Sequence, residues 1–218
     1  MKKSIVFVFT VLIFVLAAFS SAGAQSKMYV TLGQYEQDNN VSNGPEEIEW
    51  LVLAIVDQKA LLVSKYGLDT KPFNEIRKEI TWENSTIRNW LNNEFYNNAF
   101  SSSEKNKIIP VKNNNSDNPQ LGTKGGNPTT DRIFLLSVDE VLQYMTDSSS
   151  RRCKATAFAK SKNSEEYPNG YNWWWLRTPG AKEGAVHVYN DGDIYYNGGA
   201  VSNSNTDLVR PALWIEWK

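Results

Sequence analysis

Three consecutive tryptophans that lead into an arginine form the stretch with the most chemistry to offer, Asn172-Trp-Trp-Trp-Leu-Arg-Thr-Pro-Gly180. In a strand, successive side chains point to opposite faces, so Trp173 and Trp175 share a face with Arg177 while Trp174 takes the other. One interpretation is that two rings pack inside and the third covers a loop, because aromatic rings dominate core energetics. The other is that Trp173 and Trp175 are partly exposed and form a platform for a sugar or peptide.

Two arginines and two aspartates complete the predicted ligand-binding set. Arg177 and Arg210 are expected on adjacent elements, where their planar guanidinium groups could bind a carboxylate ligand or orient loops. Asp191 and Asp193, in the turn Asn190-Asp-Gly-Asp193, are ready internal acceptors for these arginines, as are loop carbonyls. Both a structural and a ligand-binding role therefore stay open for the four side chains.

A long polar insert between Pro110 and Asp131 suggests a metal site. It has no hydrophobic period, and loops of this length in a compact domain are usually functional or disordered. Its side-chain oxygens suit Ca²⁺, which takes six to eight oxygen ligands from flexible loops. The predicted ligands are Asp117, Asn118, Asn127 and Asp131. Their spacing matches no EF-hand, and such residues also serve to hydrogen-bond their own turns.

The single cysteine and single histidine exclude several site classes. Cys153 has no partner for an internal disulfide, and zinc sites built from cysteine and histidine are excluded. A nucleophilic pair would need Cys153 and His187 to meet in space. Cations flank Cys153 and could lower its pKa, but a small buried apolar side chain is the favoured interpretation.

The N-terminus has the pattern of a secretory signal peptide. Lys2 and Lys3 precede an apolar run, and Ala22-Gly-Ala24 is a cleavage site, so residues 1–24 are predicted to be removed. No cysteine lies there to carry a lipid anchor. The mature protein is expected in the periplasm, at the cell surface or outside the cell. Later apolar segments are too short for a membrane span.

Charge and length limit the partners and the domain count. Without Lys2 and Lys3, the 23 basic residues fall to 21 against 24 acidic ones, a net charge of −3. No basic stripe suits a nucleic acid backbone. Residues 25–218 are enough for one substantial core, so a single domain is predicted.

Hydrophobic periodicity places strands at both ends and helices between them. Strands are expected at 28–32, 47–56 and 60–66, the last two joined by a turn at Asp57-Gln-Lys59. A helix is predicted over 85–100, and the capping patterns Ser101-x-x-Glu104 and Ser137-x-x-Glu140 begin two more. Further predicted elements are a buried strand at 131–137, a short helix at 153–160, and strands at 171–177, 185–189, 193–196 and 208–217. This order indicates an α+β fold of short, mixed, antiparallel strands whose terminal strands pair.

Several of these motifs together resemble a known family. Ile48-Glu-Trp-Leu-Val-Leu53, Thr86-Ile-Arg-Asn-Trp-Leu91, Trp173-Trp-Trp-Leu-Arg-Thr-Pro-Gly180 and Val209-Arg-Pro-Ala-Leu-Trp-Ile215 are similar to those of bacterial secreted or surface-exposed domains of unassigned function. The order of the C-terminal motifs also resembles C-type-lectin-like folds, including the formylglycine-generating and retroelement-diversified branches. That resemblance implies paired chain ends and a ligand surface on a long irregular loop.

The same resemblance has limits. The formylglycine-generating branch needs a cysteine pair, and this chain has Cys153 alone. The Glu-Pro-Asn, Gln-Pro-Asp and Trp-Asn-Asp motifs of calcium-dependent lectins do not occur. We therefore expect a non-catalytic binding or adhesion module for an extracellular glycan or protein. The alternatives are a secreted hydrolase with a carboxylate pair, for which no spacing singles out residues, and a structural envelope protein.

Overall fold

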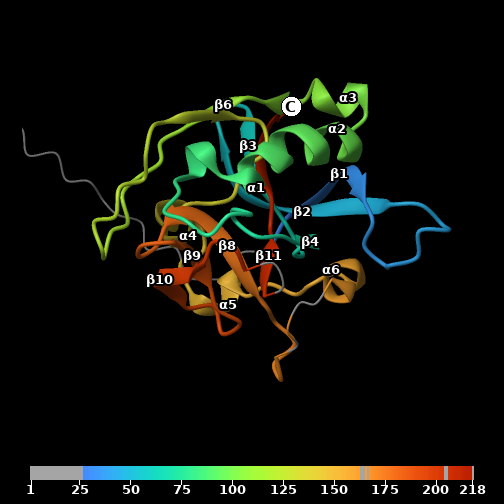
Figure 1. The fold of residues 1–218 in the computed structure, drawn as a ribbon. Helices are drawn as coiled ribbons and strands as arrows, with labels where there is room; N and C mark the ends of the chain where they lie inside the picture. Colours follow the sequence, from blue (N-terminus) through green and yellow to red (C-terminus); the bar gives the residue numbers. More distant parts are fainter. Residues whose placement is uncertain (1–26, 163–164, 166, 204–205, 218) are drawn as a thin grey trace, which may run out of the picture.

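The computed structural model describes residues 27–162, 165, 167–203 and 206–217, and within them two five-stranded sheets form the frame (Figure 1). The predicted signal peptide lies outside the described residues. The first sheet has the order β1-β2-β3-β12-β5: β1 (Tyr29–Tyr35), β2 (Glu46–Val56), β3 (Lys59–Ser64), β12 (Ala212–Glu216) and β5 (Ile108–Ile109). The second has the order β10-β9-β8-β11-β4: β10 (Ile194–Ala200), β9 (Gly184–Val188), β8 (Trp173–Pro179), β11 (Asp207–Val209) and β4 (Asp69–Thr70).

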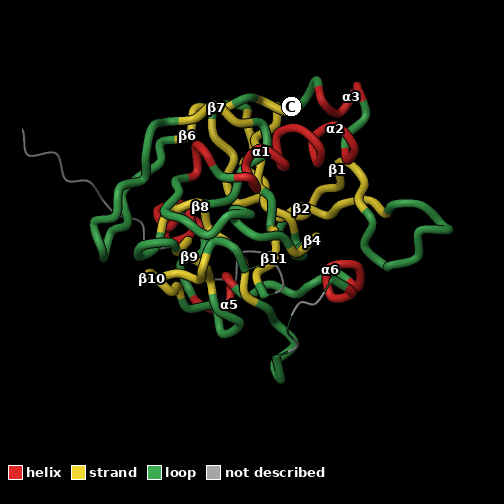
Figure 2. The backbone as a smooth tube through the Cα atoms, viewed as in Figure 1, coloured by secondary structure: helices red, strands yellow, loops and turns green. Residues whose placement is uncertain are grey.

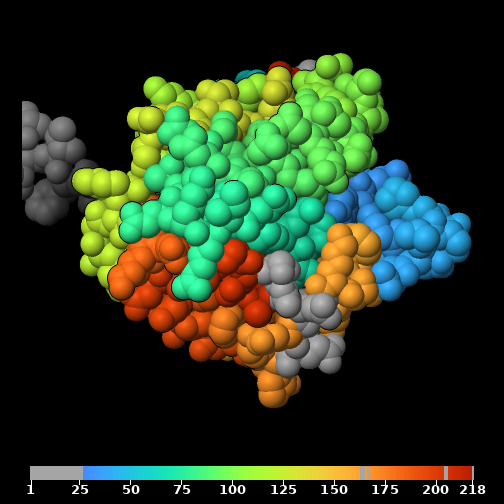
Figure 3. Space-filling view, in the orientation of Figure 1, coloured from blue at the N-terminus to red at the C-terminus, as the bar shows by residue number. Residues whose placement is uncertain are grey.

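All pairs in the two sheets are antiparallel except β8 with β11. A third, two-stranded sheet joins β6 (Val111–Asn113) to β7 (Thr129–Asp131). The loop between β6 and β7 is the long polar insert, which extends to one side of the molecule (Figure 2). It lies against the second sheet, where the Asn118 amide donates to the carbonyls of Pro179 and Tyr196 (Figure 3).

The predicted β2–β3 hairpin is confirmed. Asp57 and Gln58 have φ values of 49° and 59°, so both central residues of the turn are left-handed. This geometry matches the right-handed twist of the flanking strands.

Local capping signals set the helices where the sequence predicts them. Ser85 caps a continuous helical run made of α1 (Thr86–Trp90), the π-helix η2 (Leu91–Phe95) and α2 (Tyr96–Ala99). Both capping boxes form, at α3 (Ser102–Lys105) and α4 (Val138–Tyr144). A 3-10 turn, η1 (Trp82–Asn84), precedes α1. Among the described residues, no helix has the length and apolarity needed to cross a membrane.

Three element predictions are wrong. Apart from Arg132, the segment 131–137 is buried, but only Asp131 belongs to β7 and only Phe134 makes a further bridge, to Ala212. In place of one helix at 153–160, the chain has α5 (Ser148–Arg151) and α6 (Ala157–Ser161). The predicted strand 208–217 is two strands in different sheets, because Pro211 has no amide to donate to a ladder.

The chain ends do not pair as predicted. β1 pairs with β2, whereas β12 lies between β3 and β5, so β2 and β3 separate the terminal strands of the first sheet. The core lies between the sheets and the helices and takes buried apolar side chains from both, including Trp50, Trp82, Trp174 and Trp175. The fold is therefore mixed α+β, mostly antiparallel with short helices, in one compact domain.

Candidate functional site

One face of the second sheet gathers aromatic rings around the only histidine. Trp175 on β8, His187 on β9 and Tyr195 on β10 lie opposite one another in the strand register. Trp173 lies opposite Asp207 of β11. Since alternate residues of a strand share a face, these five side chains meet on one side of the sheet.

His187 and Asp207 form a buried pair at the centre of this face. Nδ1 of His187 lies 2.7 Å from Oδ1 of Asp207, and their side chains are 2% and 0% exposed. Thr206 donates to the other carboxylate oxygen at 2.9 Å. Because a carboxylate only accepts, the hydrogen bond assigns a proton to Nδ1. Nε2 is buried and has no hydrogen-bond partner among the described residues.

Four half-buried rings cover the open end of this face, and we call them the ring shelf: Tyr167, Trp173, Tyr189 and Tyr195. Tyr167 stacks on Trp173 with ring centroids 5.4 Å apart, and Trp173 contacts Tyr189 at 4.8 Å. Tyr189 stacks on Tyr195 at 5.0 Å. The contacts run from ring to ring without interruption, so the four form one surface rather than scattered exposed aromatics.

Amide and carboxylate groups border the ring shelf. Trp173 donates its indole N–H to Oδ1 of Asn190 at 3.2 Å, and Asn169 bonds both the carbonyl and the side chain of Asn190. The Tyr167 hydroxyl donates to Glu165 at 2.8 Å. This combination of ring faces with short polar side chains can bind a ligand that has one apolar face and several hydroxyls.

Burial raises the pKa of two phenols of the ring shelf. Burial and the hydrogen bond to Glu165 raise the pKa of Tyr167. Burial, then the neighbouring Tyr195 and Asp191, raise the pKa of Tyr189. Both hydroxyls therefore stay protonated at physiological pH and can donate hydrogen bonds.

The prediction that Trp175 is partly exposed is wrong. Trp175 is fully buried, and its indole N–H donates to the carbonyl of Lys71 at 3.0 Å. Phe73 packs edge-on against it at 6.0 Å. Trp173 and Trp175 share a face as predicted, but the segment after β4 covers Trp175 and leaves Trp173 half-buried.

The two predicted arginines are buried in structural contacts. Arg177 pairs with Glu140 and donates to the carbonyl of Leu135. Arg210 lies over the Trp174 ring at 4.9 Å and donates to the carbonyl of Ser64. Arg177 is 4% exposed and Arg210 is 3% exposed, so neither guanidinium is available to a ligand as the surface stands.

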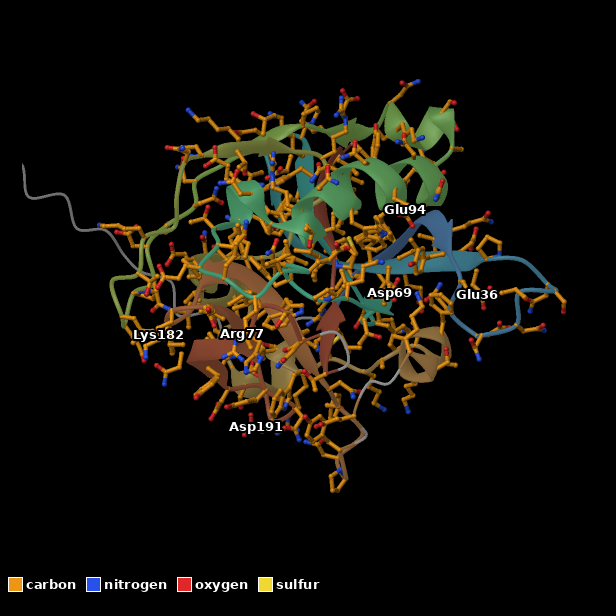
Figure 4. The ribbon with its side chains drawn as sticks, in the orientation of Figure 1. Glu36, Asp69, Arg77, Glu94, Lys182 and Asp191 are labelled. Carbon is orange, nitrogen blue, oxygen red and sulfur yellow. The ribbon has the colours of Figure 1, made fainter. Side chains whose placement is uncertain are left out.

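Asp191 and Asp193 are exposed and do not accept from these arginines. They lie at the tip of the β9–β10 hairpin, where the Asp193 amide donates to the Asp191 carboxylate at 2.9 Å. Figure 4 shows Asp191 at the outer end of this hairpin. Their position next to Asn190 puts them beside the ring shelf.

The four predicted calcium ligands have separate partners. Asp117 pairs with Lys124, Asn127 donates to Glu83, and Asn118 bonds main-chain groups. Asp131 is buried and accepts from four side chains: Trp82, Arg88, Asn113 and Thr129. The contacts hold the long loop in place, and they do not direct the four side chains toward one shared cation.

A different acidic group, Glu36, Asp38 and Glu46, comes together within 4.8 Å. Its oxygens already accept hydrogen bonds from the amides of Gln37 and Asn40. The hydrogen bond from Asn43 is the main cause that lowers the pKa of Asp38. These contacts account for the cluster as support for the loop between β1 and β2.

Cys153 is confirmed as a buried side chain, 1% exposed. Burial raises the pKa of its thiol, and this outweighs the nearby Arg210. The thiol is therefore kept protonated and unreactive.

Sequence reasoning missed most of the candidate site. It found Trp173, but not His187, Asp207, Tyr189 or Tyr195. The available signal was the alternation of apolar and ring side chains in Val186-His-Val-Tyr189, which places His187 and Tyr189 on one face of a strand. Tyr195 follows in the next predicted strand. Asp207 gave no signal, because only the parallel pairing of β11 with β8 brings it to this face.

Comparison with known proteins gives one family. A model of DUF6273, a domain of unknown function, matches residues 57–217. The chain belongs to this family. Searches of curated proteins and of solved structures found no match. The DUF6273 match includes the whole ring shelf and both residues of the His187–Asp207 pair, while β1 and β2 precede it and pair with it through β3.

Proposed function

We propose that this DUF6273 protein is an exported, non-catalytic binding module whose ring shelf binds an extracellular glycan. The observation that carries the proposal is the unbroken contact among four half-buried rings, bordered by Asn169, Asn190 and Glu165. The C–H groups on one face of a sugar ring suit the electron-rich face of an aromatic ring, and its hydroxyls suit the amides and carboxylate at the border.

Core packing does not account for this surface. Tyr196, next to Tyr195 on β10, packs against the hydrophobic core, as do Trp174 and Trp175. The ring shelf instead contacts itself and His187. Contiguous exposed apolar surface with a polar border is typical of an interaction site.

The resemblances to bacterial exported domains and to C-type-lectin-like folds are compatible with this proposal. A bacterial, secreted or surface-exposed protein would meet glycans or proteins outside the cytoplasm, and a C-type-lectin-like relationship would agree with ligand binding beside the C-terminal hairpin. The hydrolase alternative receives no comparable support. Glycoside hydrolysis typically uses two facing carboxylates, whereas Glu165 accepts from Tyr167, Asp191 accepts from its own hairpin and Asp207 is buried against His187.

An array that carries both glycans and peptides, probed with residues 25–218, tests the proposal. We expect binding to a limited set of glycans, and loss of that binding in Tyr167→Ala, whose side chain stacks on Trp173 at the edge of the shelf. Tyr66→Ala, also half-buried but remote from the shelf in the strand order, is the control. Binding to peptides alone, or to no immobilised ligand, would overturn the proposal.

A further inference from the structure

A second surface, separate from the ring shelf, combines a tryptophan with two exposed carboxylates. A cleft of about 450 Å³ lies between the segment after β4 and the helical run α1–η2. The ring, charged and amide side chains that line the cleft are Lys71, Glu75, Asn89, Trp90, Asn93 and Glu94. In Figure 4, Glu94 lies on the side of the helical run that faces β4 and Asp69.

The helix presents these residues because of its periodicity. Asn89, Trp90, Asn93 and Glu94 recur at spacings of three and four, while Leu91 and Phe95 are buried in the core. The helix widens directly after Trp90, where the amide of Tyr96 donates to the carbonyl of Leu91, five residues back. Such π-helical turns occur frequently at functional sites.

Trp90 supplies a half-buried ring with an ammonium group at its face. Nζ of Lys71 lies 4.7 Å from the ring centroid, and the Phe95 ring makes a tilted contact with Trp90 at 5.4 Å. The indole nitrogen is buried and has no hydrogen-bond partner among the described residues. The ring is therefore held in place by packing, with no hydrogen bond from its own N–H to account for its position.

The acidic side chains of the cleft also lack hydrogen bonds. Glu75 and Glu94 are exposed, and their carboxylates accept no hydrogen bond from any described residue. Together with Lys71 they give the cleft a net charge of −1. This charge favours a neutral or amino-bearing ligand over an anionic one.

From these contacts we infer that the Trp90 cleft is a second ligand site, for a neutral or amino-bearing sugar residue. The sugar ring packs against Trp90 beside Lys71, and its hydroxyls or amino group bond Asn93 and Glu94. The inference does not rest on the ring shelf, because no residue that lines the cleft belongs to the shelf.

Two-dimensional ¹H–¹⁵N NMR of the mature protein tests it, because the indole N–H signals of Trp90 and Trp173 report the two sites separately. The probes are methyl β-glucopyranoside, glucosamine and galacturonate, each added to tens of millimolar. We expect the Trp90 signal to move with the first two and to stay in place with galacturonate. Trp90→Phe assigns the signal.

Glu94→Gln should weaken glucosamine binding about tenfold, because a hydrogen bond to a charged group is lost. Glu79 is an exposed glutamate outside the cleft, so Glu79→Gln should leave the affinity for glucosamine unchanged. A Trp90 signal that moves with no sugar, or moves only with galacturonate, would overturn the inference. Movement of the Trp173 signal alone would overturn the inference and leave the proposed function intact. Movement of the Trp90 signal alone would support the inference and count against the proposed function.

Discussion

At the scale of single residues, His187 is the side chain whose surroundings most need an explanation. Nε2 of His187 is a buried polar atom without a partner among the described residues, which costs free energy of folding on the order of 1–3 kcal/mol. Asp207 fixes one ring nitrogen, and Gly199 leaves room for the ring, since a Cβ at that position would lie 3.2 Å from Cε1. The shelf rings thus rest on a histidine with one ring nitrogen held by Asp207.

The three tryptophans differ in what they contribute to stability. Trp174 and Trp175 are both fully buried and both donate their indole N–H to main-chain carbonyls. We expect Trp174→Ala and Trp175→Ala each to lower the free energy of unfolding by about 3–5 kcal/mol. Trp173→Ala should cost clearly less, because the ring is half-buried.

Urea unfolding at neutral pH measures these differences. The assignment of buried and half-buried rings is wrong if Trp174→Ala or Trp175→Ala keeps the wild-type urea midpoint. It is also wrong if Trp173→Ala lowers the midpoint as much as each of these two variants does.

At the scale of elements, short-range signals predicted the fold best. Capping boxes at Ser101 and Ser137 and the Asp57–Gln58 turn depend on residues three or four positions apart, so the sequence contains all their determinants. The strand expected at 131–137 failed because burial alone cannot distinguish a strand from an irregular buried segment.

The α3 cap predicts a pH dependence. Burial acts to raise the pKa of Glu104, but hydrogen bonds from the Ser101 hydroxyl and from the amides of Gly33 and Ser101 outweigh it and hold that pKa below its usual value. A carboxyl pKa that is lower in the folded state stabilises the fold above the unfolded value of about 4.3. That stabilisation is lost as pH falls through the folded pKa.

Glu104→Gln should therefore lose less stability than wild type between pH 7 and pH 3. Urea midpoints at the two values measure this, with Glu79→Gln as the matched exposed control. An equal fall of the urea midpoint from pH 7 to pH 3 in Glu104→Gln and wild type would contradict the lowered pKa of Glu104.

At the scale of the whole molecule, contacts distant in sequence decide what the surface offers. The segment after β4 covers Trp175 from about a hundred positions away, as the bond from Trp175 to Lys71 shows. The Arg210–Pro211 step sends the chain from the second sheet into the first, and the β8–β11 pairing places Asp207 beneath the rings. No pattern within one segment encodes these pairings, which is why the sequence predicted Trp173 but not the histidine beside it.

The central claim is that the ring shelf binds the ligand, and two adjacent tyrosines test it most directly. Tyr195 belongs to the shelf, while Tyr196 follows it on β10, is also half-buried, and packs against the core. Isothermal titration of the glycan selected on the array should show affinity at least about tenfold weaker in Tyr195→Ala and unchanged in Tyr196→Ala. Equal affinities in wild type and Tyr195→Ala, or an equal loss in both variants, would contradict the account.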